Sequence, residues 1–295
     1  MPNLRDIQKR ITSVQGTRQI TRTMEMVATA KIRRAQERIE SAAPYSDSMM
    51  SVLANVASNA QGIAHPLLEE HESVDRVIMI VAVSDRGLAG GFNANVLRMA
   101  EKQIEEHREA GRTVDLIVSG KRAFQYFSYR GIDPIARYID SSDKPTYAMA
   151  REIAQIASHG YINGDVDLVT ISYNRFKNVA EQIPTTVQVL PIAQDVVDVP
   201  AGADEQEADA EYLFEPSAAE VLGRLLPTYL ETVIFRALLD SAAAEQGARR
   251  RAMKSATDNA TEMIGSLTRS FNRARQAAIT TEIAEIVGGA AALED

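Results

Sequence analysis

Residues 228–287 read TYLETVIFRALLDSAAAEQGARRRAMKSATDNATEMIGSLTRSFNRARQAAITTEIAEIV, a stretch without proline. Only Gly247 and Gly265 interrupt it, and alanine, leucine, arginine, methionine and glutamate are abundant, which is the composition of one continuous helix. A helix of about 62 residues is roughly 95 Å long at 1.5 Å per residue, far more than one compact domain needs. We therefore expect something outside the domain to use that length.

A second long helix is expected at the N-terminus, with Asn3 as its N-cap and Asp6 in its first turn. In both segments, mostly small and apolar residues recur in steps of three and four, which is typical of a seam between helices. The seam positions are Leu4, Ile7, Ile11, Val14, Arg18, Thr21, Glu25, Ala28, Ile32, Ala35, Ile39 and Ala42, and Met253, Ala256, Ala260, Met263, Leu267, Ser270, Ala274, Ala277, Thr281, Ala284 and Gly288. We interpret the pattern as an antiparallel coiled coil of the two ends; two long helices packed on a domain surface are the alternative.

The middle of the chain alternates apolar, strand-like runs with helical segments. The expected strands are residues 76–83, 115–119, 135–138, 167–173 and 182–190, and the expected helices are residues 93–109, 121–129 and 146–158. Such alternation predicts an open, largely parallel sheet, whose last two strands pair antiparallel because their connection is short. The predicted fold is therefore α/β, an antiparallel coiled coil of the N- and C-terminal helices plus a central Rossmann-like α/β domain.

Four segments follow from this reading. They are an N-terminal coiled-coil helix (1–60), a central α/β domain (74–194), an acidic loop and short helix (195–226) and a C-terminal coiled-coil helix (227–295). Pro44 is expected to kink or end the first helix, and Pro227 to bend the chain into the last one. A short strand is possible at 212–214.

The composition excludes several classes of protein. The chain has no cysteine, which excludes disulfides and thiolate metal sites, and no run of eighteen apolar residues or signal pattern, so we expect neither a membrane span nor direct lipid insertion. The net charge is −8, yet residues 1–40 carry nine basic and four acidic side chains, and residues 245–279 carry seven and three. Basic helices predict a partner with an acidic surface, and nucleic acid is the rival interpretation.

The turn Gly87-Leu88-Ala89-Gly90-Gly91 follows the first strand and precedes a helix. Glycine turns at helix N-termini can bind phosphate, but this one matches neither G-x-G-x-x-G nor the P-loop pattern, so a tight turn with close helix–sheet packing is favoured. The four histidines lack metal-ligand spacing, and no catalytic arrangement is recognisable. No metal, no cofactor and no catalytic residue are therefore expected.

A stripe near the C-terminus lies beside the seam rather than in it: Ile279, Ile283, Ile286 and Ala290. In an antiparallel pair, the end of the C-terminal helix lies beside the start of the N-terminal helix. If the C-terminal helix continues past that start, these side chains have no partner helix and need another apolar environment. We therefore predict that another protein encloses this end of the helix.

Five runs of the sequence are distinctive: ITRTMEMVATAK (20–31), SDRGLAGGFN (84–93), ATDNA (256–260), NRARQAAITTEI (272–283) and EIVGGA (285–290). In these runs, and in their order along the chain, the sequence resembles the gamma subunit family of F-type ATP synthases. The resemblance implies a non-catalytic rotor shaft, with a coiled coil inside a ring of three alpha and three beta subunits and an α/β domain on the membrane c ring beside the epsilon subunit. It further implies a peripheral protein on the cytoplasmic face of the bacterial plasma membrane, needing no cofactor.

The resemblance also implies contact residues. Met24, Arg249, Arg275, Gln276, Thr280 and Glu282 match positions that in the family face the acidic beta-subunit loops or the catch of the ring, and Tyr212 and Glu215 match the foot that touches the c ring and epsilon. Two departures are Ala89, where the family often has cysteine, and Arg250, where it commonly has methionine. The alternatives are a small nucleotide-binding α/β enzyme with a coiled-coil handle and a nucleic-acid scaffold.

Overall fold

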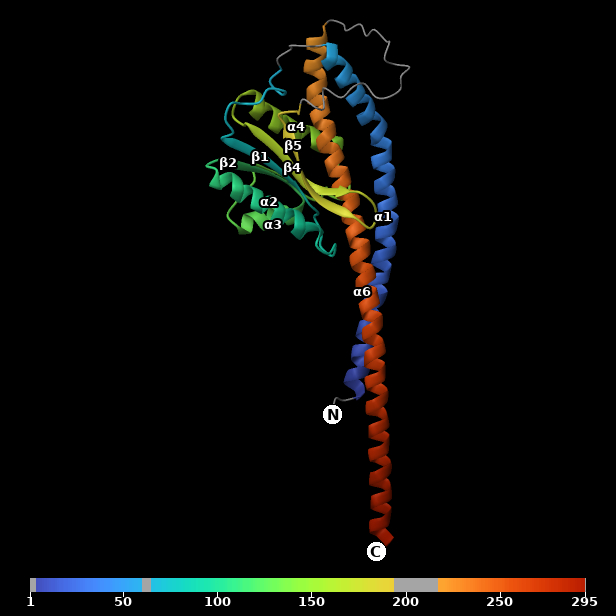
Figure 1. The fold of residues 1–295 in the computed structure, drawn as a ribbon. Helices are drawn as coiled ribbons and strands as arrows, with labels where there is room; N and C mark the ends of the chain where they lie inside the picture. Colours follow the sequence, from blue (N-terminus) through green and yellow to red (C-terminus); the bar gives the residue numbers. More distant parts are fainter. Residues whose placement is uncertain (1–3, 60–64, 194–216, 295) are drawn as a thin grey trace. The chain divides into compact units, whose positions relative to one another are not determined.

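The structure is a computed structural model that describes residues 4–59, 65–193 and 217–294 (Figure 1). The chain divides into two compact units, one formed by residues 1–28 and 250–295 and the other by residues 29–249. Two long helices, α1 (Leu4–Asn59) and α6 (Ala218–Glu294), contribute to both units. The expected N-cap, the acidic loop and the possible strand at 212–214 lie outside the described residues.

The unit of residues 29–249 contains a five-stranded sheet of order β3-β2-β1-β4-β5. Its strands are β1 (Arg76–Ala82), β2 (Thr113–Ser119), β3 (Ala136–Tyr138), β4 (Leu168–Phe176) and β5 (Gln182–Leu190). β1 pairs in parallel with β2 and β4, β2 pairs in parallel with β3, and β5 is antiparallel to β4. The predicted α/β fold is confirmed, including the antiparallel last pair.

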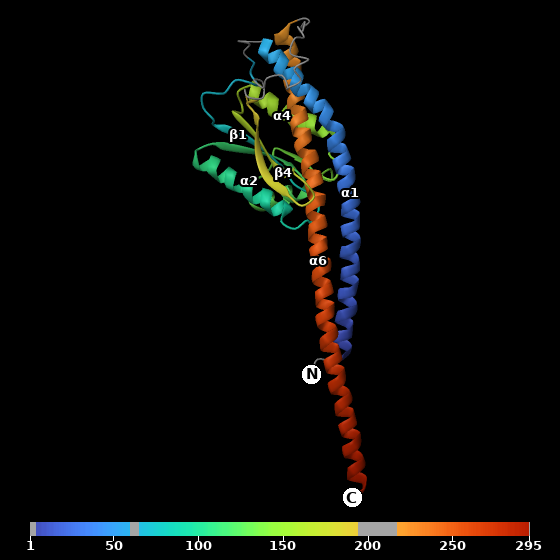
Figure 2. The same ribbon diagram turned by 45° about the vertical axis from the view of Figure 1, so that its right-hand side comes forward.

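Helices cover both faces of this sheet (Figure 2). On one face, Val77, Met79 and Val81 of β1 pack with α2 (Phe92–Glu109) and α3 (Lys121–Tyr129). On the other face, alternate residues of β1 pack with α4 (Tyr147–Ile162), with the first third of α6 and with the end of α1. Burial on both faces explains why β1 is a continuous apolar run instead of an alternating one.

Neither proline ends a helix. Pro44 lies inside α1, so the helix continues through it and only the expected ending is wrong, while a kink there stays a prediction. Pro227 lies inside α6, so the expected separate short helix ending at Leu226 is wrong. A proline in a helix interior costs about 3 kcal/mol because it lacks an N–H and crowds the preceding turn. Leu226 and Leu230, on either side of Pro227, are 0% and 1% exposed in the same core. Burying each side chain contributes about 1.5–3 kcal/mol, so packing outweighs the defect.

In the other unit, residues 4–28 of α1 and the part of α6 from residue 250 lie side by side and antiparallel (Figures 1 and 2). Ile7 and Ile11 are buried in α1 and Met253 and Ala260 in α6. The hydroxyl oxygens of Thr21 and Thr257 are 2.7 Å apart in the interface. The predicted antiparallel pair of terminal helices is therefore confirmed.

The predicted seam of α6 is wrong at two positions. Met263 is 53% exposed and Ser270 is exposed, whereas Ile264 and Phe271, each one residue later, are partly covered. A straight helix has 3.6 residues per turn, so a stripe written with a period of 3.5 drifts by about 20° per seven residues. The covered stripe of α6 has moved by one residue within two turns.

Candidate functional site: a collar of loops around helix α6

Nine consecutive residues of α6, Ser241–Arg249, are all buried. A helix that packs on one side exposes its opposite face, so this segment is enclosed all round. The loops around it follow β1 (83–91), β3 (139–146) and β4 (177–181). We call these three loops the collar.

The first loop of the collar contains the glycine turn. Leu88 and Gly90 have φ angles of 64° and 58°, and Leu88 is 63% exposed. The side chain of Asn93 closes the turn, because its Oδ1 accepts from the Ser84 N–H at 3.0 Å and its Nδ2 donates to the Arg86 carbonyl at 3.2 Å. The turn is thus held by its own flanking residues.

Small residues of α6 fill the crevice beside this turn. Ala244 and Ala248 form a buried cluster with Ala89 and Phe92, and Phe176 at the end of β4 packs against it. A Cβ added at Gly247 would lie 2.8 Å from Nε2 of Gln182, the first residue of β5, and 3.5 Å from the Val179 carbonyl oxygen, so the helix comes very close to the connection between β4 and β5. In an open sheet of this order, the crevice between the carboxyl ends of β1 and β4 is the usual place for a ligand. Here the chain's own helix occupies it.

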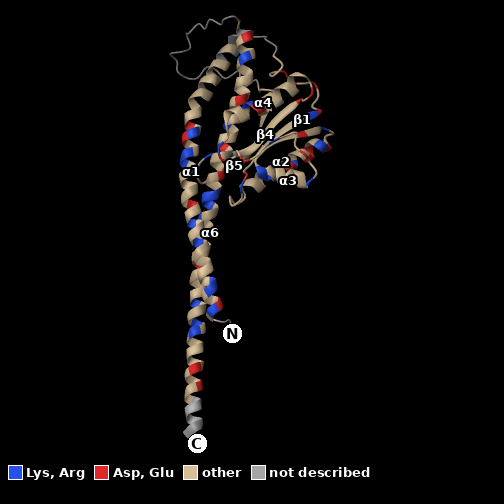
Figure 3. Ribbon diagram, turned by 180° about the vertical axis from the view of Figure 1, so that it is seen from behind, with Lys and Arg blue, Asp and Glu red and all other residues tan. Residues whose placement is uncertain are grey.

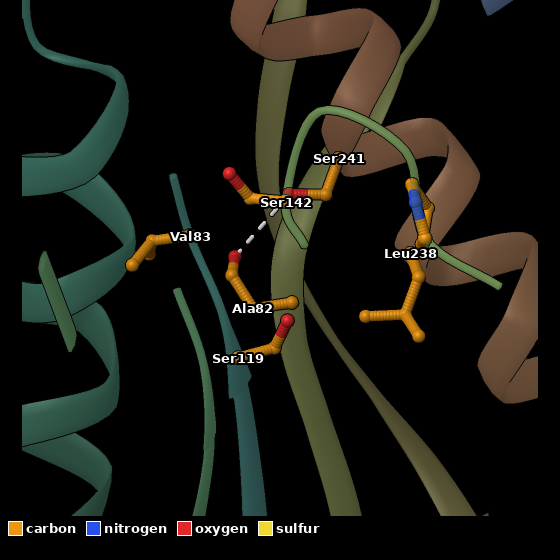
Figure 4. Close-up of a pocket in the computed structure, with 7 residues that line it drawn as sticks. Ala82, Val83, Ser119, Ser142, Leu238 and Ser241 are labelled. Carbon is orange, nitrogen blue, oxygen red and sulfur yellow. Dashed lines mark hydrogen bonds between the residues drawn. The ribbon is translucent and has the colours of Figure 1, made fainter. Parts of the chain in front are cut away.

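A small cavity lies beside the crevice (Figure 4). Its lining comes from Ala82, Val83, Ser119, Ser142, Pro145, Leu238 and Ser241. The Ser241 hydroxyl donates to the Ala82 carbonyl at 3.3 Å. The cavity volume is about 10 Å³, which is room for one water molecule and far too little for a phosphate. None of these lining residues belongs to the glycine turn, so it is the packing of Ala89 against Ala244 and Ala248 that favours a tight turn over a phosphate site.

Arg249 joins α6 to the glycine turn from inside. Its Nη2 donates to Glu245 Oε1 at 2.5 Å and to the Gly87 carbonyl oxygen at 3.2 Å, and the residue is 9% exposed. Burial raises the pKa of the Glu245 carboxyl, and the Arg249 charge opposes that rise. The structure therefore places Arg249, which was expected to face the beta subunits, in a buried ion pair within the chain.

Asp85 connects the first two loops of the collar. Its carboxylate accepts the backbone N–H groups of Lys121 at 2.8 Å, Asp140 at 2.9 Å and Ser142 at 2.9 Å. Burial by itself raises the pKa of Asp85, but the hydrogen bonds from Ser142, Lys121 and Asp140 outweigh it and the pKa is lowered. Asp85 is therefore a charged, structural hydrogen-bond acceptor.

Most of the other expected contact residues lie on the helices of the smaller unit. Met24 is half-buried and lines a groove of α1 with Gln19, Ile20 and Thr23. Arg275, Gln276, Thr280 and Glu282 are all exposed on α6. Tyr212 and Glu215 lie outside the described residues.

The apolar stripe of α6 is exposed as well. Ile279, Ile283, Ile286 and Val287 are 48%, 56%, 72% and 63% exposed. Counting equal steps along both helices from the Thr21–Thr257 contact places Leu4 opposite Ala274. About 20 residues of α6, roughly 30 Å, thus continue past the described start of α1 (Figure 1). We call residues 279–287 the tip.

Comparison with known proteins identifies the family. The family model described as ATP synthase matches residues 3–293. The ATP synthase gamma chain of Desulforamulus reducens is 46% identical over 100% of both chains, and that of Chlorobaculum tepidum is 44% identical over 100% of both. The chain belongs to the ATP synthase gamma chain family.

Solved structures share the fold of this gamma-chain family. The central stalk and c ring of Tetrahymena thermophila mitochondrial ATP synthase includes a chain with a TM-score of 0.60 at 21% identity, with 80% of this chain and 99% of that chain covered. A chain of the Euglena gracilis mitochondrial ATP synthase in rotational state 3 has a TM-score of 0.66 at 16% identity, with 98% and 94% covered. These likenesses support the fold.

Neither a metal site nor a membrane span is found in the described part of this gamma-chain family member. Across residues 4–59, 65–193 and 217–294, no group of three or more histidine, aspartate or glutamate side chains is placed to hold a metal ion. No helix among those residues has both the length and the apolar content that a membrane crossing requires.

Sequence reasoning missed three residues of this site: Asp85 and Asp143 in the collar, and Glu245 on α6. Glu245 was detectable, because it precedes Arg249 by four residues and such pairs face one another on a helix. Asp85 and Asp143 were not, because their hydrogen-bond partners lie up to 112 residues away along the chain. No local pattern marks a carboxylate that bonds to distant loops.

Proposed function

We propose that this chain is the central shaft of a bacterial ATP synthase. It is a non-catalytic rotor subunit that couples rotation of the membrane c ring to conformational change in the three catalytic beta subunits. The observation that carries this function is the exposed tip of α6, in a chain that matches gamma chains over its whole length. An apolar stripe that continues past its partner helix needs an enclosing surface from another protein.

A single helical shaft can impose different states on three equal sites. The paired helices have no threefold symmetry, so each surrounding subunit faces a different set of side chains. A contact can shift a conformational equilibrium only by its differential free energy for the two states. Three identical subunits around one asymmetric shaft are therefore biased differently, and rotation moves each bias to the next subunit.

The proposed partners are three alpha and three beta subunits, the epsilon subunit and the membrane c ring. The complex is membrane-associated, and we place the chain peripherally on the cytoplasmic face of the plasma membrane. Figure 3 shows Lys and Arg along both helices of the smaller unit, and a basic surface suits acidic partner loops.

We further propose which residues make these contacts. Arg275, Gln276, Thr280 and Glu282 are exposed on α6 and available to the ring, and Met24 contributes from α1. Arg249 is expected to act from inside the collar, since its guanidinium group is already bound by Glu245 and Gly87. Tyr212 and Glu215 are proposed for the foot on the c ring and epsilon.

Reconstitution tests the proposal. The chain is mixed with alpha and beta subunits, and the stoichiometry and ATPase activity of the purified complex are measured for the full chain and for a chain that ends at residue 275. A variant with Ile279, Ile283 and Ile286 changed to serine keeps the helix length and removes only the apolar stripe.

The expected result is one copy of the full chain for each three alpha–beta pairs. Assembly or activity should fall for both altered chains, because each lacks the apolar side chains that the ring encloses. A full chain that forms no complex, or a serine variant that assembles and supports ATPase activity like the unaltered chain, would contradict the shaft function or the enclosed tip, respectively.

A further inference from the structure

One carboxylate of the α/β domain holds both long helices. Asp143 lies in the loop that follows β3, and its Oδ2 accepts from Lys31 Nζ of α1 at 2.6 Å. Its Oδ1 accepts from Gln246 Nε2 of α6 at 3.0 Å. The Asp143 carbonyl oxygen also accepts from Arg38 Nη1 of α1 at 3.4 Å. Two helices that are far apart in sequence thus meet at one residue of the domain.

The loop that carries Asp143 is itself fixed to the sheet. Asp85, at the carboxyl end of β1, accepts the backbone N–H groups of Asp140 and Ser142, and the Asp85 N–H donates to the Ser142 hydroxyl oxygen at 2.9 Å. Asp140 has a φ of 60°, a conformation that non-glycine residues adopt only where the surroundings require it. Asp143 is therefore held by the rigid end of the central strand.

These contacts lie at the ends of the compact unit that contains the α/β domain. The compact unit that contains the α/β domain ends at residue 29 of α1 and at residue 249 of α6. Lys31 and Gln246 are two and three residues inside those limits. Any twist passed between the domain and the remaining parts of the two helices must go through the segments that Asp143 holds.

We propose that Asp143 is a torque-bearing positioning residue, which fixes α1 and α6 to the α/β domain at the point where they leave it. This inference rests on the proposed rotor function and adds the place where the domain transmits rotation to the helices. The side chains of Lys31 and Asp143 are 35% and 46% exposed, and pairs of this kind contribute little to stability. The contacts of Asp143 with Lys31 and Arg38 therefore serve mainly to orient α1, while the buried segment of α6, residues 241–249, supplies most of the stability at this place.

The test uses the assembled, membrane-reconstituted ATP synthase that contains the Asp143→Ala variant. ATP hydrolysis and ATP-driven proton pumping are measured together, without and with an opposing proton gradient. We expect normal hydrolysis and about twofold fewer protons pumped per ATP against the gradient. The Tm of the isolated chain should fall modestly, because the buried Gln246 Nε2 loses its acceptor, whereas loss of the exposed Lys31 pair alone should not change it. The control is Asp115→Ala, which removes a 2.8 Å ion pair with Arg76 within the sheet and should leave pumping unchanged.

A charge exchange separates orientation from mere loss of a side chain. In the double variant Lys31→Asp, Asp143→Lys, the ion pair is reversed. The buried Gln246 Oε1, which has no hydrogen-bond partner among the described residues, becomes an acceptor for the new lysine. Pumping should return toward the unaltered value. A double variant that pumps as poorly as Asp143→Ala would contradict the positioning role.

The two failures are distinguishable. If the unaltered chain does not assemble with alpha and beta subunits, the rotor function is wrong. If it assembles and Asp143→Ala pumps normally against the gradient, only the torque-bearing role is wrong. Should Asp143→Ala fail to assemble, Asp143→Asn is measured instead, because it keeps an oxygen for Gln246 and loses only the charge. Normal pumping by that variant would likewise overturn the inference, and reduced pumping would support it.

Discussion

Two stretches of α6, nine residues each, resemble one another in composition and differ completely in environment. Residues 241–249, within the collar, and residues 279–287, the tip, are both made mainly of small and apolar residues with a few charges. Each residue of the first stretch is buried and each residue of the second is exposed. The chain itself therefore covers α6 along residues 241–249 and leaves it exposed along residues 279–287.

This difference indicates that the enclosed stretch of α6 stabilises the fold, whereas its tip serves assembly. In the collar, the contacts of α6 are with the chain's own loops, so a substitution there should change the free energy of unfolding. At the tip, the partner surface is absent from the isolated chain, so a substitution there should change assembly and leave folding alone. Matched substitutions in the enclosed stretch and on the exposed end of α6, from residue 275 onward, test this comparison.

The largest difference is expected for the two arginines. Arg249→Met leaves the Glu245 carboxylate buried without its partner and should lower the free energy of unfolding by about 3 kcal/mol. Arg275→Met, at an exposed position, should change it by less than about 0.5 kcal/mol. Urea denaturation of the isolated chain measures both, and equal destabilisation would refute the comparison.

The next difference is expected for two alanines. Ala244 is 0% exposed and packs against the glycine turn, so Ala244→Leu forces extra volume into a filled crevice and should cost about 1–3 kcal/mol. Ala284→Leu adds the same atoms at an exposed position and should be nearly neutral in the free energy of unfolding. Thermal melting of the two variants makes the comparison. A neutral Ala244→Leu would mean that the collar is not closely packed.

A smaller effect is expected at Asp240, one residue before the enclosed stretch. Burial raises the pKa of this carboxyl to about 6, although Arg236 and Arg175 oppose the rise. A raised carboxyl pKa means that the folded state holds its proton more tightly than the unfolded state. The stability that comes from the protonated form is therefore lost as the pH rises through about 6.

Asp240→Asn should remove that loss. The variant should be more stable than the unaltered chain by about 1–2 kcal/mol at pH 8, and the gain should shrink as the pH falls from 6 toward 4. Asp258→Asn is the control, because Asp258 is exposed on the same helix and pairs with Lys254. A gain at Asp240 that is independent of pH would show that its charge is not responsible.

Much of the fold could be predicted from the sequence. The apolar run of β1 and the glycine turn fixed the start of the α/β domain, and the short connection after β4 gave the antiparallel pair. The path of α6 through the collar was not predictable. Its residues Ala244, Gly247 and Ala248 have the size of seam residues, and size does not say whether a second helix or a set of loops lies opposite. Pro227 was misjudged because tertiary burial of its neighbours overrides helix propensity.

The candidate site was predictable only in part. The exposed stripe at Ile279, Ile283 and Ile286 followed from helical periodicity and from the position of the N-terminus. The environment of Arg249 did not, since its ion pair with Glu245 and its bond to Gly87 depend on how α6 crosses the sheet. Contacts for the remaining expected residues stay predictions.

The most direct test of the comparison uses the absence of cysteine from the chain. One variant carries Ile283→Cys at the tip and another carries Ala243→Cys in the enclosed stretch, where Ala243 is 0% exposed. The rate of maleimide labelling is measured for each variant, alone and after assembly with alpha and beta subunits. We predict fast labelling of the tip variant alone, strong protection of it in the complex, and slow labelling of the Ala243→Cys variant in both states. A tip cysteine that reacts as fast in the assembled complex as in the free chain would contradict this prediction.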